Sequence, residues 1–88
     1  MNTLLLNFHT DAGHGWIEVP KLIVRGTGKS NQISSCSYQD NKNVYLEEDD
    51  DAPLILNELK KTFTIKLNEI NHNGPEGAPM RKMKYMWY

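Results

Sequence analysis

Alternation of apolar and polar residues marks the strands of this chain. Leu4, Leu6 and Phe8 recur at every second position, which places all three on one face of an extended segment. Turns rich in Gly, Asp and Asn separate such segments, as expected of hairpins. The pattern predicts strands at 3–9, 16–19, 33–38, 44–48 and 62–70.

Helical periodicity is clearest in the middle of the chain. Ala52, Ile55 and Leu59 follow the i, i+3, i+7 spacing of one helix face. A helix is therefore predicted over Ala52–Lys61. A shorter helix is predicted at 20–26, where a proline can begin it and a glycine can end it.

The predicted elements follow the order ββαββαβ and end in a C-terminal tail. Helices can cover one face of a sheet that is built mainly from hairpins. We therefore expect an α+β fold, a two-layer sandwich with a mostly antiparallel sheet and helices on one face. The 88 residues suffice for one domain, so 1–88 is expected to fold as a single unit. The tail, Met80–Tyr88, is predicted either to form an edge strand or to dock on the domain.

Charge and cysteine content narrow the function classes. Ten basic and eleven acidic residues give a formal net charge of −1, which argues against general attraction to nucleic acid or anionic membranes. Cys36 is the only cysteine, so no intrachain disulfide can form and a reducing cytoplasm is the expected compartment. Cys36 alternates onto the same face as Tyr38 and is predicted to be buried. No stretch approaches the roughly 20 apolar residues of a membrane span, so we expect a soluble protein without a membrane partner.

Metal-capable side chains gather around the first predicted turn. His9, Asp11 and His14 supply two imidazoles and one carboxylate, a donor set that binds Zn²⁺ or Fe²⁺ in hydrolytic and oxygen-using enzymes. His72 could join this set only if the last strand of the domain pairs beside the first. In the alternative interpretation Asp11 caps the turn, His14 lies at the surface, and the protein holds no cofactor.

An acidic run precedes the main predicted helix. It consists of Glu47, Glu48, Asp49, Asp50 and Asp51. Part of the run can stabilise the start of the helix through capping and through the helix dipole. Five carboxylates exceed what capping requires. The remainder is predicted to be an exposed acidic patch, either simply solvated or bound to a basic surface of a partner.

Basic and aromatic residues are interleaved in the tail. Arg81, Lys82, Lys84, Tyr85 and Trp87 combine positive charge with rings on which bases of single-stranded nucleic acid can stack. The same mixture, together with the methionines of the tail, is typical of adaptable protein interfaces. In a third interpretation the apolar side chains pack on the domain while the basic groups stay solvated.

Short blocks of distinctive sequence occur in order between positions 8 and 55. They read Asp11-x-Gly13-His14-Gly15-Trp16-x-x-Val19-Pro20, then Ser37-Tyr38-Gln39, then Val44-Tyr45-Leu46-Glu47-Glu48-Asp49-x-Asp51. This pattern resembles small proteins of bacteriophages, prophages and plasmids that have no assigned activity. The segment 25–32 and the C-terminal third depart from it. The resemblance implies an accessory protein of a mobile element, acting in the cytoplasm of a bacterial host cell, and carries no catalytic residue over.

Binding without catalysis is the function that we expect. Small phage proteins commonly act by occupying surfaces, so the chain is expected to bind a host bacterial protein through the acidic patch and the tail, as an inhibitor of a defence or regulatory complex. One alternative is a small metal-dependent enzyme that uses the set around the first turn. Another is nucleic-acid binding through the tail. A small chain with an apolar tail also fits a homo-oligomer.

Overall fold

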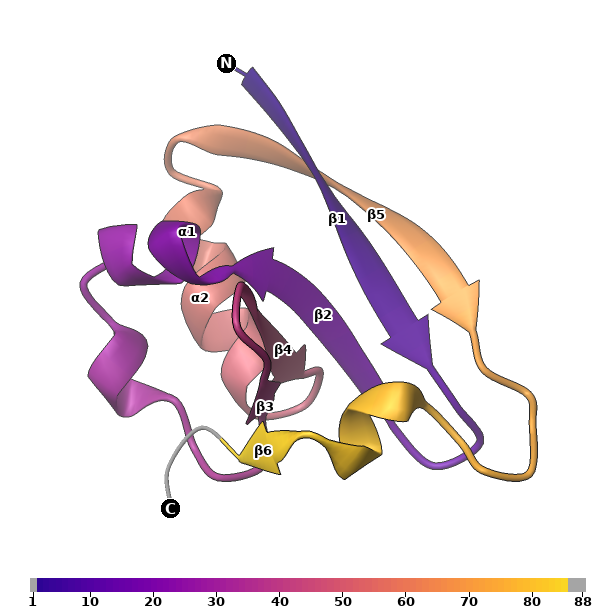
Figure 1. Cartoon of the computed structure of the whole chain (residues 1–88). Coiled ribbons are helices and arrows are strands. Elements are labelled where there is room, and N and C mark those ends of the chain that lie inside the picture. The colour runs from indigo at the N-terminus through magenta and orange to yellow at the C-terminus, as the bar shows by residue number, and fades with distance from the viewer. Residues whose placement is uncertain (1, 86–88) are drawn as a thin grey trace.

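A six-stranded sheet forms the centre of the structure, a computed structural model that describes residues 2–85 and gives only the backbone at positions 84 and 85 (Figure 1). The strands are β1 (Asn2–Thr10), β2 (Gly15–Pro20), β3 (Tyr38–Gln39), β4 (Asn43–Glu47), β5 (Phe63–Asn71) and β6 (Lys84–Tyr85). Across the sheet they stand in the order β5-β1-β2-β4-β3-β6.

Antiparallel pairing dominates the sheet. It joins β1 to β2, β2 to β4, β4 to β3, and β3 to β6. β1 and β5 pair in parallel, in unbroken register from Asn2 opposite Phe63 to Thr10 opposite Asn71. This arrangement confirms the expected α+β fold with a mostly antiparallel sheet.

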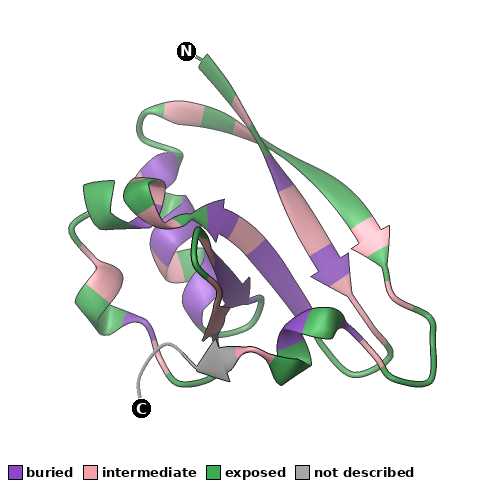
Figure 2. Ribbon diagram, viewed as in Figure 1, coloured by how far each residue is buried: buried purple, intermediate pink, exposed green. Residues whose placement is uncertain are grey.

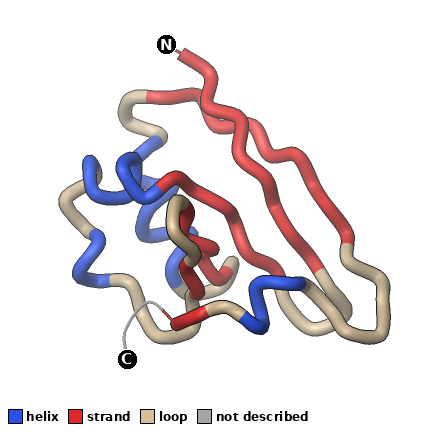
Figure 3. The backbone as a smooth tube through the Cα atoms, in the orientation of Figure 1, coloured by secondary structure: helices blue, strands red, loops and turns tan. Residues whose placement is uncertain are grey.

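Helices α1 (Lys21–Gly26) and α2 (Asp51–Leu59) pack on one face of the sheet (Figure 3). Two short 3-10 turns, η1 (Ser30–Gln32) and η2 (Pro79–Lys82), lie in the connecting segments. Figure 2 shows buried residues concentrated in β2, β4 and α2. The main core consists of Leu6, Ile17, Val19, Val24, Ile33, Val44, Leu46, Ala52, Ile55, Leu56 and Leu59.

The opposite face of the sheet carries a second, smaller core. Trp16 and Tyr45 project from β2 and β4 and pack with Ala78 and Met80, which follow β5 in the chain. We call residues 72–83 the C-terminal strap, because this segment crosses below the ends of the central strands before β6 joins the sheet (Figure 1). The sheet is therefore covered on both faces over its central strands.

Several local predictions change in the structure. The predicted strand 33–38 is mostly irregular, since only its end contributes to β3 (Tyr38–Gln39). Cys36 is exposed, which makes its predicted burial wrong, because the residue lies in a turn rather than in an alternating strand. For the tail, both predicted alternatives hold in part: Met80 docks on the second core, and β6 forms an edge strand. Within residues 2–85, no helix is long and apolar enough to cross a membrane.

Candidate functional site

An open cleft of about 500 Å³ lies on the face of the sheet opposite the helices. It is lined by residues from β2, β3, β4 and the C-terminal strap, and by the turns that flank them. These residues are His14, Trp16, Ser35, Cys36, Tyr38, Glu47, Asp49, Asp50 and Arg81. The cleft thus brings part of the predicted acidic patch and one basic residue of the predicted tail to the same place.

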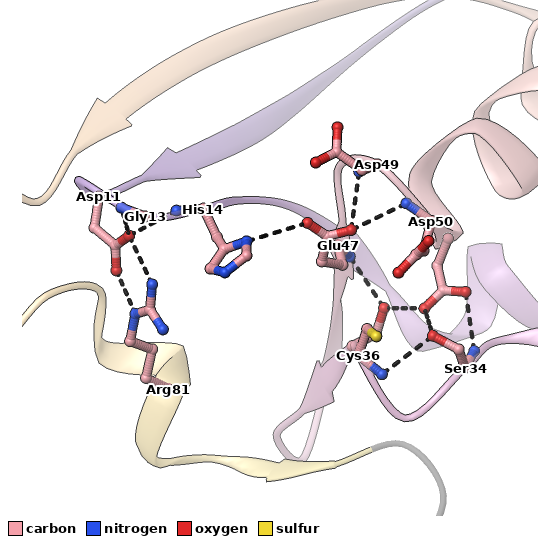
Figure 4. Close-up of polar contacts among 11 residues, drawn as sticks. Asp11, Gly13, His14, Ser34, Cys36, Glu47, Asp49, Asp50 and Arg81 are labelled. Atoms are coloured by element: carbon pink, nitrogen blue, oxygen red, sulfur yellow. Dashed lines mark hydrogen bonds and ion pairs between the residues drawn. The ribbon is translucent and has the colours of Figure 1, made fainter.

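Asp11 fixes the side of the cleft that is formed by the first turn. One carboxylate oxygen accepts hydrogen bonds from the backbone N–H groups of Gly13 and His14, at 2.9 and 3.0 Å. The Arg81 guanidinium donates to both oxygens (Figure 4). The backbone N–H of Ala78 donates to one of them. With a side chain only 3% exposed, Asp11 joins the turn to the C-terminal strap. These bonds, the one from Arg81 above all, hold the pKa of Asp11 far below its usual range.

Trp16 forms the floor of the cleft. Its indole is 2% exposed, and the Arg81 guanidinium lies over the ring, 5.0 Å from its centroid. Tyr38 packs against the same indole, with ring centroids 6.1 Å apart. A guanidinium over an aromatic face is a favourable cation–π arrangement. The face of the indole is therefore already occupied by the guanidinium of Arg81.

Glu47 is a structural part of the acidic run. It is 7% exposed, and one of its oxygens accepts hydrogen bonds from the backbone N–H groups of Asp49 and Asp50, at 2.9 and 3.0 Å. The other oxygen lies 3.6 Å from Nδ1 of His14 (Figure 4). Glu47 thus closes the turn between β4 and α2, rather than standing free as a member of an exposed patch.

Asp51 has a similar internal role at the start of α2. It is 4% exposed and accepts hydrogen bonds from the backbone and hydroxyl of Ser34, at 2.9 and 2.8 Å. The hydroxyl of Ser37 also donates to it and accepts the backbone N–H of Glu47 at 3.0 Å. These bonds join the irregular segment before β3 to both β4 and α2, so the cleft has a rigid wall on this side.

The remaining carboxylates of the run, on Glu48, Asp49 and Asp50, are exposed. Partial burial raises the pKa of Glu48, and the neighbouring charges of Asp49 and Glu47 act in the same direction. At Cys36 a hydrogen bond with Ser34 favours the thiolate, but the hydrogen bond and the negative charge of Asp50, together with some desolvation, outweigh it and raise the pKa of the thiol. The rim of the cleft therefore disfavours further negative charge and favours a cation.

The structure does not bring His9, Asp11 and His14 together. Asp11 is engaged with Arg81, and His14 faces Glu47. Among residues 2–85 no group of three or more His, Cys, Asp or Glu side chains is arranged to hold a metal ion. His9 has other partners, because its imidazole bonds Glu18 and His72.

His9 is instead the centre of a hydrogen-bonded chain across three segments. Its Nε2 lies 2.8 Å from a carboxylate oxygen of Glu18, and its Nδ1 lies 2.9 Å from Nε2 of His72. His72 was expected to approach His9 only if the strand before it pairs with the first strand of the chain. The parallel pairing of β5 with β1 meets this condition. These two bonds connect β1 to β2 and to the residue that follows β5.

The other residues of the predicted tail lie apart from the cleft lining or beyond what can be described. Lys82 is exposed, with its ammonium 3.8 Å from Glu76. The backbone of Lys84 and Tyr85 pairs with β3. Trp87 lies outside the described residues. Arg81 is thus the tail residue for which the structure shows a place in the cleft.

Sequence reasoning missed the aromatic floor and the serine anchors. Alternation predicts Trp16 on the face opposite Ile17 and Val19, as the structure has it, but it does not predict the cleft that Trp16 helps to line. Nothing in the local sequence shows that Ser37 would meet Asp51, because the two come together only through the tertiary fold. Comparison with known protein families, curated proteins and solved structures finds no match to this chain.

Proposed function

We propose that this chain is a non-enzymatic accessory protein of a phage-type mobile element that binds a basic segment of a bacterial host protein in the acidic, aromatic-floored cleft. Occupying such a segment would inhibit the host protein, a component of a defence or regulatory complex. The observation that supports this most is the convergence of the distinctive sequence blocks. They supply His14 and Trp16, then Tyr38, then Glu47 and Asp49, all of which line one cleft.

The chemistry of the cleft favours an arginine-bearing partner. Asp49 and Asp50 offer exposed carboxylates at the rim, which can accept paired hydrogen bonds from a guanidinium. Half-buried Tyr38 supplies aromatic surface beside them. Arginine is enriched at protein interfaces because it combines these two modes of contact.

Features of the cleft also argue against nucleophilic catalysis by its one thiol. The raised pKa of Cys36 disfavours the thiolate, which is the nucleophilic form. Binding of nucleic acid through the tail has less support, since Arg81 is already neutralised by Asp11 and Lys82 lies near Glu76. Partner binding therefore rests on the exposed carboxylates, rather than on the basic residues.

The test is affinity capture from a bacterial lysate with nuclease treatment, followed by mass spectrometry. Wild type is expected to retain one protein in stoichiometric amount. The double variant Asp49→Lys with Asp50→Lys reverses two exposed rim charges without touching the buried carboxylates, and it is expected to lose the partner. The matched control, Glu58→Lys with Glu76→Lys, makes the same charge change outside the cleft lining.

The control variant is expected to capture the partner as well as wild type does. Equal loss in both variants would assign the effect to net charge and overturn the cleft as the binding site. Retention of the partner by a folded Asp49→Lys, Asp50→Lys protein would do the same. Capture that disappears on nuclease treatment would support the nucleic-acid alternative instead.

A further inference from the structure

The outer edge of β5 is a long strand edge without a neighbour in the described sheet. β5 spans nine residues and pairs with β1 over its full length, while no described strand lies on its other side. Its register with β1 is unbroken, so no bulge twists this edge away, and its sequence contains no proline. Natural proteins usually protect such edges, because the free N–H and C=O groups are a template for another strand.

Apolar side chains at this edge are also incompletely covered. Phe63 and Ile65 pack against the main core, but Leu67 is 46% exposed. Figure 1 shows that β1 and β5 continue beyond the helical layer. An added strand beside β5 would therefore bury apolar surface as well as satisfy backbone groups.

We propose that β5 pairs with β5 of a second copy of this chain, antiparallel about a two-fold axis at Leu67. In this register Leu67 meets Leu67 of the other copy, Lys66 meets Asn68, and Ile65 meets Glu69. No like charges stand directly opposite each other. A dimer of this type is isologous, so one edge that complements itself is sufficient to form it.

Neighbouring registers are less favourable. A two-fold axis at Lys66 would place two ammonium groups opposite each other, which destabilises a strand pair. An axis at Asn68 would place Leu67 opposite Glu69 and Lys66 opposite Ile70. A shift that pairs odd with even positions would place the Leu67 side chains of the two copies on opposite faces of the joined sheet. The axis at Leu67, the middle residue of β5, avoids like charges and is the one that pairs all nine residues of the strand.

The proposed dimer is independent of the proposed function. β5 stands at one end of the sheet, whereas β3 and β4, which carry much of the cleft, stand toward the other end. Pairing through β5 would produce one continuous sheet with both clefts accessible. Two clefts in one particle would raise the avidity for a partner that presents its basic segment more than once.

The experiment compares particle mass by light scattering over a range of concentrations. Wild type is expected at twice the 10.1 kDa mass of the chain. Leu67→Lys and Leu67→Glu each place like charges at the two-fold axis, so each is expected to weaken association by about tenfold or more. An equimolar mixture of these two variants is expected to recover the dimer, because an ammonium then meets a carboxylate at the axis. The control is Leu22→Lys, which changes a leucine that is 79% exposed on α1.

Thermal unfolding first establishes that each variant is folded. We expect folded variants, because the side chain at position 67 is exposed. A wild-type monomer at every concentration would overturn the proposal. Folded variants that dimerise as wild type does would overturn β5 as the interface. A variant mixture that stays monomeric would overturn the register at Leu67. Loss of the dimer in the Leu22→Lys control would assign association to another surface and equally overturn the proposal.

Discussion

At the scale of single residues, buried carboxylates hold segments that are far apart in the chain. Asp11 and Arg81 are 70 positions apart, and their ion pair attaches the C-terminal strap to the first turn. Asp51 does the same for the serine turn before β3. Each of these acids is nearly inaccessible to solvent, so its negative charge is balanced by donors within the fold.

Replacing Asp11 with Asn is expected to lower the free energy of unfolding by about 1–2 kcal/mol at neutral pH, because the charge-assisted bonds with Arg81 are lost. In wild type the folded pKa lies below the unfolded value of about 3.9. The contribution of Asp11 is therefore complete above that value and is lost as the pH falls below it. Urea titrations across this range should show the difference between the two proteins shrinking on acidification. A difference that does not change with pH would contradict the role given to the charge.

Replacing Ser37 with Ala is expected to lower the free energy of unfolding by about 1–3 kcal/mol. The substitution removes the hydroxyl that accepts the buried backbone N–H of Glu47 and donates to an oxygen of Asp51. The exposed neighbour provides the control, since Ser35→Ala should change stability by less than about 0.5 kcal/mol. Chemical denaturation of the two variants measures both values. Equal effects would show that the hydroxyl of Ser37 contributes nothing specific.

At the scale of elements, the C-terminal strap depends on a backbone conformation that favours glycine. Gly77 has φ of +73°, and a Cβ added there would lie 2.9 Å from a carboxylate oxygen of Asp11. Its backbone N–H donates to the carbonyl of Gly74 at 3.1 Å, which closes the turn before η2. The tight approach is what allows Asp11 to reach the backbone of Ala78.

Three alanine variants separate backbone strain from crowding. Gly77→Ala is expected to destabilise the fold by about 2 kcal/mol or more, through positive φ together with the close carboxylate. Gly28→Ala shares a positive φ of +74° but meets no atom within 4 Å, so about 1 kcal/mol is expected. Gly74→Ala has neither feature and should be nearly neutral. Thermal melts of the three proteins test this order, and an equal loss at positions 77 and 28 would remove the contribution of crowding.

The elements themselves were largely predictable because their signals are local. Alternation predicted β1, β2 and β5, and the spacing of Ile55 and Leu59 predicted α2 to within two residues at its C-terminal end. The site was less predictable. The sequence suggested acidic and basic contact features, but their meeting in one cleft depends on the strap, whose path is set by contacts with Trp16 and Asp11. Whether Glu47 or Glu48 is buried is likewise decided by tertiary contacts.

At the scale of the whole molecule, the sheet is stabilised from both faces. The helices cover the main core, and the C-terminal strap covers the second core, where Met80 is 1% exposed against Trp16 and Tyr45. The second core also supports the floor of the cleft. We therefore expect stability and the proposed partner binding to be coupled through the strap.

Replacing Met80 with Ala is expected to lower the free energy of unfolding by about 2–5 kcal/mol, because it opens a cavity beneath the strap. In a Trp87→Phe background, the emission of Trp16 should shift to longer wavelength as water reaches the indole. Met83→Ala, at a half-buried position beside the same core, should have a smaller effect on both quantities. Unfolding curves recorded by fluorescence give both readouts. If Met80→Ala keeps the wild-type stability and emission maximum, the packing of Met80 on Trp16 in the second core is contradicted.

The parallel pairing of β1 with β5 also determines the order in which the chain can fold. Asn7 and Asn68, whose side chains bond across these strands at 3.2 Å, are 61 positions apart. During synthesis β1 emerges early and can form its hairpin with β2, but its other edge must wait until nearly the whole domain has left the ribosome. We expect this vacant edge to make the nascent chain most dependent on chaperones just before β5 appears. Docking of β5 would then close this edge, and the C-terminal strap and β6, which follow β5 in the chain, would dock last.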